Sequence, residues 1–129
     1  MQGVASKELS GLTSILDGLS RTLGEKLMDA IDLIEKIDGN VIFSGIGKSG
    51  MIANKIAATL TSTGTSSLFL HGTEASHGDL GLLKKNDVLF LISNSGETIE
   101  LRNIILFAKK NNIKIISITA NGESLVSKQ

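Results

Sequence analysis

The sequence predicts an α/β protein, a three-layer, doubly wound parallel sheet preceded by N-terminal helices. From residue 40 onward, short apolar segments alternate with amphipathic helical segments, a pattern typical of a parallel sheet with right-handed crossovers. The three later apolar segments also lack a clean alternation of polar and apolar residues, as strands covered on both faces do. We expect the strand order 2-1-3-4, in which the first and third strands are neighbours.

Residues 6–37 carry the longest helical pattern of the chain. Leucine and isoleucine recur there at steps of three or four residues, at Leu9, Leu12, Leu16, Leu19, Leu23, Leu27, Ile31 and Ile34. Gly18 and Gly24 weaken the middle, so the pattern fits one helix or two consecutive helices. The apolar stripe is typical of a helix packed against its own chain, and an interface with a second subunit is a compatible alternative.

Four strands and two further helices follow the turn signal Asp38-Gly39-Asn40. The predicted strands are residues 41–43, 67–70, 87–92 and 113–118, and the predicted helices are residues 49–63 and 97–110. Gly64 lies where a glycine would end the first of these helices. The expected domains are therefore an N-terminal helical segment, residues 1–39, and one ligand-binding α/β domain, residues 40–129.

The amino-acid composition limits which partners the protein can bind and indicates the compartment in which it works. The 129 residues include 13 basic and 13 acidic side chains, so no basic field exists for nucleic acid. The absence of cysteine excludes disulfides and thiolate metal sites and suits a reducing compartment. No apolar run approaches the roughly 18 residues of a membrane span, and we see no signal peptide. We expect a cytoplasmic protein without a membrane partner.

The stretch SGIGKSG, residues 44–50, connects the first predicted strand to the next helix. Its glycines let the backbone approach a ligand closely, and a helix N-terminus offers unpaired N–H groups to an anion. A tight turn without a ligand explains the loop equally well when it is taken alone. A nucleotide-binding P-loop is excluded by spacing, because it needs a glycine where this chain has Ile42.

A dinucleotide loop fits the same stretch better, through Gly45, Gly47 and Gly50. That reading also requires an acidic residue roughly 20 positions later, at the end of the second strand, to bind the ribose. The chain has Leu70-His71-Gly72 at that point, and Glu74 lies beyond the strand. The dinucleotide interpretation is therefore weakened, although the spacing alone does not exclude it.

The stretch SNSGET, residues 93–98, runs from the third predicted strand into a helix. Ser95 could be a simple N-cap with Glu97 in the first turn, but the loop carries three hydroxyls and one amide, more than a cap needs. Hydroxyls and free N–H groups form a cup for one phosphate. With the expected strand order, both loops lie at one crevice, which suits a compact phosphorylated ligand.

Four stretches, SGIGKSG, IAATLTSTGT, LHGTEASHGDLG and SNSGET, together resemble the sugar isomerase (SIS) domain over most of residues 40–122. The combination of GKSG with EASHGDLG resembles its D-arabinose 5-phosphate isomerase branch, which supplies Kdo for lipopolysaccharide. The resemblance implies a flavodoxin-like fold and interconversion of D-arabinose 5-phosphate with D-ribulose 5-phosphate through an enediol(ate). It also implies a homotetramer with no cofactor. A non-catalytic SIS module that binds or senses a sugar phosphate is the alternative.

The resemblance also implies the site residues. Three match positions that the family uses in catalysis: Lys48, His77 and Glu97. Lys48 would stabilise negative charge, His77 would open the sugar ring or carry a proton, and Glu97 would be a base unless it only compensates the helix N-terminus. The expected phosphate-binding residues are Gly47, Ser49, Ser93, Asn94, Ser95 and Thr98.

Other polar residues are weaker candidates. Glu74 is a minor one, and His71 is expected to be structural. Two histidines without cysteine are thin support for a metal, so no metal site is expected.

The chain also departs from the family pattern. Gly72 stands where the family usually has proline. The family's fifth strand, a later glutamate and a later histidine have no counterpart here. We therefore expect an N-terminal piece of a longer protein, whose base could lie in the missing part. The EASHGDLG cluster favours the isomerase over the sensor, because a sensor needs a phosphate cup but not this additional polar cluster.

Overall fold

A computed structural model describes residues 2–75 and 78–129. The chain divides into two compact units, Met1–Lys36 and Ile37–Gln129. No helix in the described part of the chain is long and apolar enough to cross a membrane.

The first unit consists of two helices, α1 (Gln2–Leu19) and α2 (Thr22–Lys36). Of the two alternatives left open by the sequence, two consecutive helices are therefore correct. Gly24 permits the tight connection, because a β-carbon there would lie 2.1 Å from the carbonyl oxygen of Leu19. The sequence suggested that the apolar stripe packs against the rest of the chain. In α2 this packing is absent, because none of its residues is buried. Exposed apolar side chains of this unit include Leu9, Leu12, Ile15, Leu16, Leu23, Leu27, Met28 and Ile31.

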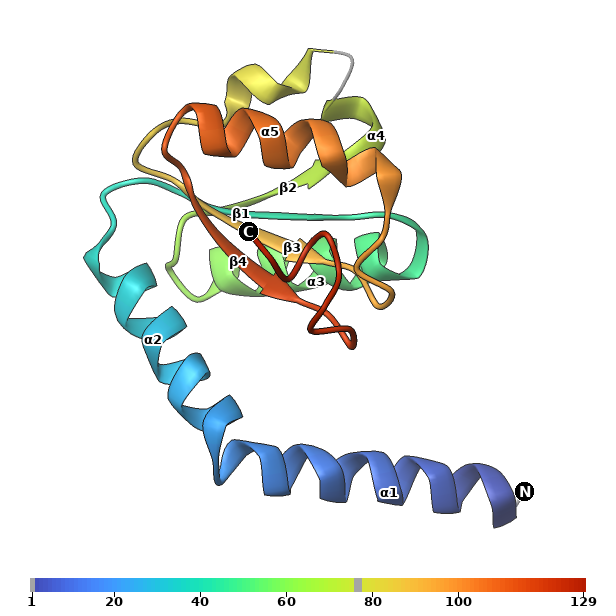
Figure 1. Ribbon diagram of the computed structural model, residues 1–129. Coiled ribbons are helices and arrows are strands. Elements are labelled where there is room, and N and C mark those ends of the chain that lie inside the picture. Colours follow the sequence, from blue (N-terminus) through green and yellow to red (C-terminus); the bar gives the residue numbers. More distant parts are fainter. Residues whose placement is uncertain (1, 76–77) are drawn as a thin grey trace. The chain divides into compact units, whose positions relative to one another are not determined.

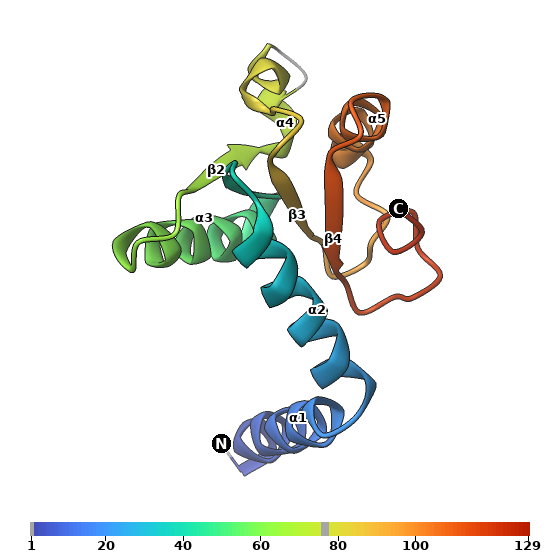
Figure 2. The ribbon, with the colours of Figure 1, turned by 90° about the vertical axis from the view of Figure 1, so that its left-hand side faces the viewer.

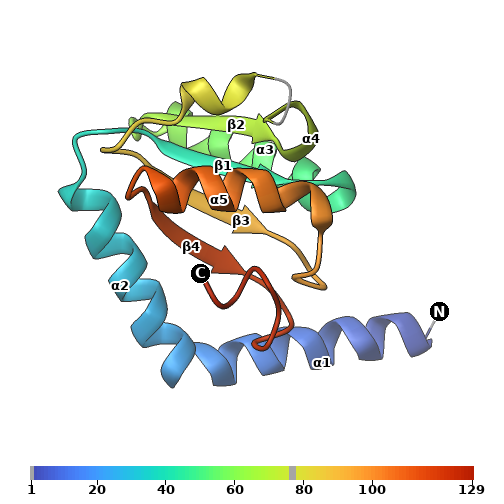
Figure 3. The ribbon, with the colours of Figure 1, turned by 45° about the horizontal axis from the view of Figure 1, so that its top comes forward.

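The second unit is a four-stranded parallel sheet in the order β2-β1-β3-β4, which confirms the predicted order (Figure 3). Its strands are β1 (Val41–Gly45), β2 (Ser67–His71), β3 (Val88–Ile92) and β4 (Lys114–Ile118). One face is covered by α3 (Gly47–Ser62), and the other by α4 (Gly72–Ala75) and α5 (Arg102–Lys110), as Figures 1 and 2 show. The sheet therefore forms the middle layer of three.

Burial on both faces explains the apolar composition of the two central strands. Every residue of β1 and β3 is buried. Toward α5, Ile42 and Leu91 join a cluster with Leu101 and Ile104. Toward α3, the rings of Phe43 and Phe90, which are partners in the strand register, stack with centroids 4.7 Å apart.

Helix boundaries differ from the prediction at one functionally important place. Gly64 ends α3 as expected, with a positive φ of 99°. Residues 97 and 98, however, are not helical: a short 3-10 helix, η2 (Ile99–Leu101), comes first, and α5 follows. The predicted start of this helix at residue 97 was therefore wrong, and the alternative in which Ser95 is its N-cap does not hold. Thr98 is extended, with ψ of 109°, because residues 93–98 make the local hydrogen bonds described below.

The connection from β2 to β3 contains two short helices that the sequence did not predict. The first is α4, and the second is η1 (Asp79–Leu82), a 3-10 helix.

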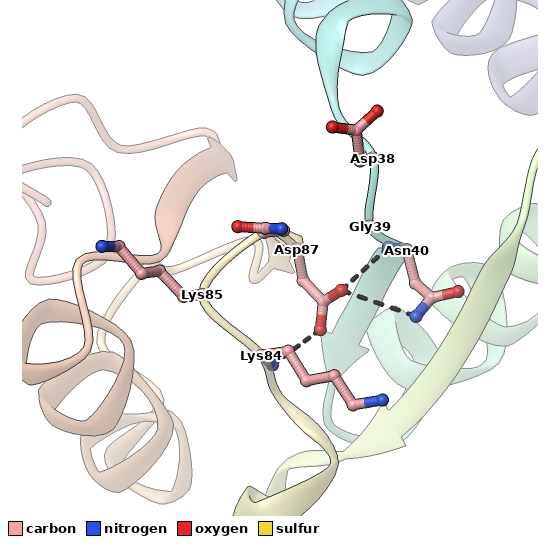
Figure 4. Close-up of a pocket in the computed structure, with 7 residues that line it drawn as sticks. Asp38, Gly39, Asn40, Lys84, Lys85 and Asp87 are labelled. Carbon is pink, nitrogen blue, oxygen red and sulfur yellow. Dashed lines mark hydrogen bonds between the residues drawn. The ribbon is translucent and has the colours of Figure 1, made fainter.

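A buried carboxylate fixes the amino ends of β1 and β3 (Figure 4). Asp87 is 2% exposed. Its Oδ1 accepts hydrogen bonds from the backbone N–H and the side-chain amide of Asn40, at 2.8 and 3.5 Å, and its Oδ2 accepts the N–H of Lys84 at 2.7 Å. These residues line a polar pocket of about 370 Å³ at the amino-terminal edge of the sheet. Since ligands of such sheets bind at the carboxyl edge, we assign Asp87 a structural role.

Replacement of Asp87 by alanine is expected to lower the free energy of unfolding by about 3 kcal/mol, because donors that it now satisfies would lose a charged acceptor. Asp38→Ala is the matched control, since Asp38 is exposed at the same pocket, and its cost should stay within about 0.5 kcal/mol. Urea denaturation followed by circular dichroism measures both. Equal effects of the two substitutions would contradict the assigned role.

Candidate functional site

Two polar loops meet at the carboxyl edge of the sheet because their strands are neighbours. Gly45, the last residue of β1, pairs in register with Ile92, the last residue of β3. After Gly45, the rest of SGIGKSG turns into α3, and after Ile92 the SNSGET loop begins. The crevice expected from the sequence is therefore formed by the strand pairing itself, with α3 and α5 on opposite faces of the sheet (Figure 2).

Glycine makes the first loop possible. A β-carbon at Gly45 would lie 2.9 Å from the carbonyl oxygen of Ile92, and one at Gly50 would lie 2.8 Å from the carbonyl oxygen of Gly45. Gly47 has a positive φ of 57° and open space around it. The strand can therefore turn directly into α3, with the helix N-terminus placed against the strand ends.

The N-terminus of α3 is open to an anion. Its N-cap residue, Ile46, makes no side-chain hydrogen bond to the helix. The first N–H groups of an α-helix have no acceptor inside the helix, and the helix dipole favours negative charge there. Lys48 is exposed in this first turn, and Ser49 is half-buried beside it. Within the described part of the chain, no acidic group lies within ion-pairing distance of Lys48.

The second loop is held by its own hydroxyl groups. Ser93 is 3% exposed, and its Oγ accepts the N–H of Gly96 at 3.1 Å and lies 2.7 Å from Oγ1 of Thr98. The Oγ of Ser95 accepts the N–H of Glu97 at 3.2 Å. Asn94 and Ser95 are exposed. The loop thus has a buried anchor at Ser93 and an exposed rim of hydroxyl and amide donors, the kinds of group that bind a phosphate.

The residues after β4 pack against this loop, which the sequence did not predict. The carbonyl oxygen of Asn94 accepts the N–H of Ala120 at 3.1 Å, and that of Gly96 accepts the N–H of Val126 at 3.0 Å. Gly96 has a φ of 71°, and a β-carbon there would lie 1.9 Å from Oγ of Ser124. Ser124 is fully buried. The outer side of the cup is therefore closed by the C-terminal segment.

Glu97 belongs to the same contact. Its Oε1 accepts the backbone N–H of Leu125 at 2.9 Å, and the side chain is otherwise exposed. This hydrogen bond fixes the carboxylate at the rim of the second loop. A helix N-terminus does not explain its position, because the helix begins only after Thr98.

The structure thus groups most of the residues expected at the site. The two loops contribute eight of them: Gly47, Lys48, Ser49, Ser93, Asn94, Ser95, Glu97 and Thr98. His77 lies outside the described residues. Glu74 is exposed on α4. His71 ends β2 in register with Gly45, so it belongs to the same edge of the sheet although the sequence suggested only a structural role.

Comparison with known families agrees with this geometry. The SIS domain model matches residues 33–129. The chain belongs to the SIS domain family. The match covers all four strands and both loops, so the family identity that the motifs suggested is confirmed.

Several members of this SIS family are similar over most of this chain. The arabinose 5-phosphate isomerase KdsD of Pseudomonas aeruginosa is 44% identical over 113 residues, which is 88% of this chain and 35% of that protein. The arabinose 5-phosphate isomerase KpsF of Escherichia coli O6:H1 is 45% identical over 121 residues, 93% of this chain and 37% of that protein. The chain therefore spans well under half the length of these relatives.

Solved structures show the same SIS fold. Escherichia coli CFT073 c3406, solved in complex with A5P, superposes with a TM-score of 0.82 at 44% identity, over 91% of this chain and 62% of that one. The phosphoheptose isomerase GmhA of Neisseria gonorrhoeae has a TM-score of 0.83 at 16% identity, over 99% of this chain and 80% of that one, and it supports the fold alone.

Gly96→Ala is expected to destabilise the domain more than Gly47→Ala. Both glycines have a positive φ, a conformation that costs alanine about 1–2 kcal/mol. A β-carbon at Gly96 would also overlap Ser124, whereas one at Gly47 would meet open space. Overpacking adds about 1–3 kcal/mol more, so Gly96→Ala should lower the free energy of unfolding by about 3 kcal/mol. Urea denaturation measures the difference. Equal costs would show that the C-terminal segment does not confine the loop.

Proposed function

We propose that this chain is the sugar-phosphate-binding part of an aldose–ketose isomerase that interconverts D-arabinose 5-phosphate and D-ribulose 5-phosphate. The observation that carries the proposal is the pair of donor-rich loops at one crevice, in a chain about 45% identical to proteins named arabinose 5-phosphate isomerase. The similar Escherichia coli structure in complex with A5P supports the same class of ligand.

In the proposed complex the phosphate occupies the SNSGET cup. Thr98, Ser95 and Asn94 donate to its oxygens, and the buried Ser93 exchanges its present hydroxyl contact for one with the phosphate. Ser49 and the N–H groups near Gly47 add donors from the start of α3. Hydroxyl and backbone donors bind a dianion without requiring a large cationic patch, in keeping with the neutral charge of the chain.

The reaction moves one proton between two adjacent carbons of the sugar. A base removes the proton from C2 of the aldose, an enediol(ate) forms, and a proton returns at C1 to give the ketose. Lys48, exposed and free of acidic neighbours in the described residues, stabilises the enediolate oxygen. We propose His77 for ring opening or proton transfer. Glu97, held by Leu125, is proposed as a site residue and a candidate base.

The wider role of the protein is part of the same proposal. We infer that the reaction supplies Kdo synthesis for lipopolysaccharide, in the cytoplasm, without a cofactor. A homotetramer is proposed as the working assembly, and the exposed apolar side chains of α1 and α2 support self-association.

Deuterium incorporation tests the reaction. In D₂O with D-ribulose 5-phosphate, we expect proton NMR to show C2-deuterated D-arabinose 5-phosphate above a blank without protein. Lys48→Met should slow the exchange about 100-fold, as loss of one charge-stabilising group does. Lys55→Met, an exposed lysine further along α3, is the matched control and should leave the rate unchanged. Binding without exchange would mean that these residues hold the sugar phosphate but lack the base, as in a sensor or in an isomerase whose base lies elsewhere in the protein. Absence of binding would contradict both functions.

A further inference from the structure

Two buried side-chain polar atoms in the described part of the chain lack a hydrogen-bond partner, Oγ of Ser44 and Nδ1 of His71. Buried polar atoms are nearly always paired, so an unpaired one needs an explanation. Both lie near the carboxyl ends of their strands, at the edge that carries the proposed site. Ser44 is fully buried, whereas His71 is half-buried, so His71 is the one that can also reach a ligand.

The His71 ring lies on the sheet face that α3 covers. Phe69, two residues earlier on the same face, has its Cζ 3.6 Å from where a β-carbon at Gly50 of α3 would lie. The rings of Phe69 and His71 meet edge to face, with centroids 6.1 Å apart. His71 is thus on the side of the sheet where the first turn of α3 carries Lys48.

The backbone after His71 is fixed against the first loop. Gly72 is buried, and a β-carbon there would lie 2.8 Å from Cδ1 of Ile46 and from Cδ2 of Leu101. The end of β2 therefore packs directly on the residue that caps α3. This contact holds His71 in place relative to the SGIGKSG turn.

The buried nitrogen also decides which hydrogen bond the ring can offer. A neutral imidazole has one N–H donor and one acceptor nitrogen. A proton on Nδ1 would bury a donor without an acceptor, and orphaned buried N–H groups are rare, so the tautomer protonated at Nε2 is favoured. The ring then offers one donor, at Nε2.

We propose that His71 is a further substrate-binding residue, whose Nε2–H donates to a hydroxyl or carbonyl oxygen of the sugar. The inference rests on the proposed function and names a contact within it. Because β1 lies between β2 and β3, and neighbouring strands are about 4.8 Å apart, His71 is about 10 Å from the end of β3. A phosphate bound at residues 93–98 places the sugar, and not the phosphate, within reach of His71.

Two amide variants test which nitrogen matters. The side-chain amide of glutamine places its nitrogen near the position of Nε2, and that of asparagine places it near Nδ1. His71→Asn should weaken binding of D-arabinose 5-phosphate about threefold to tenfold, the effect of one lost hydrogen bond, and His71→Gln should retain more of the affinity. Neither variant should change the Kd for inorganic phosphate. NMR titration of this chain measures all four values.

Nitrogen-15 NMR of the His77→Gln chain, in which His71 is the sole histidine, reports the tautomer. We expect the proton to be on Nε2. The Nε2 resonance should shift when D-arabinose 5-phosphate is added but not when inorganic phosphate is added. A proton on Nδ1, or equal losses in the asparagine and glutamine variants for both ligands, would overturn the inference. The amides of Ser95 and Gly96 separate the two claims. If they respond to both ligands while His71 does not, only the His71 contact fails; if they respond to neither, the proposed function fails too.

Discussion

The parallel pairing of β1 with β3 is the constraint on which the rest of the site depends. These strands are separated in the chain by α3, β2 and the two short helices before β3, yet they are neighbours in the sheet. Asp87 fixes their amino ends, the stacked rings of Phe43 and Phe90 join their middles, and Gly45 lies beside Ile92 at their carboxyl ends. Each of these contacts acts on the same pair, so the spacing between the two loops is set by the core.

The two loops differ in the groups that they offer to the proposed ligand. The first has little side-chain chemistry of its own and depends on three glycines to bring a helix N-terminus and Lys48 to the strand ends. The second depends on hydroxyl groups, with Ser93 and Thr98 in contact and Gly96 confined by Ser124. One loop therefore offers a fixed dipole and a flexible cation, and the other offers a shaped set of donors. In the proposed complex, a phosphorylated sugar uses both.

The sequence predicted the strands and both loops because apolar periodicity and glycine spacing are local signals, as at Gly64 and in SGIGKSG. The sheet order followed from the doubly wound fold class that these elements indicated. It missed the delayed start of α5, because that depends on contacts of Glu97 with Leu125 and of Gly96 with Val126, some 30 residues away. The sequence placed His71 correctly at the strand end but gave it only a structural role, for a similar reason. Its unpaired Nδ1 becomes visible only when β2 and α3 pack together, whereas the letters Leu70-His71-Gly72 suggest only a strand end.

A crystal structure of this chain with D-arabinose 5-phosphate tests the central claim most directly, that the crevice between β1 and β3 binds the phosphorylated sugar. The account predicts the phosphate within hydrogen-bond distance of the Ser95 and Thr98 hydroxyls, with the sugar extending over β1 toward His71. A phosphate bound instead at the amino-terminal edge, beside Lys84 and Lys85, would contradict it.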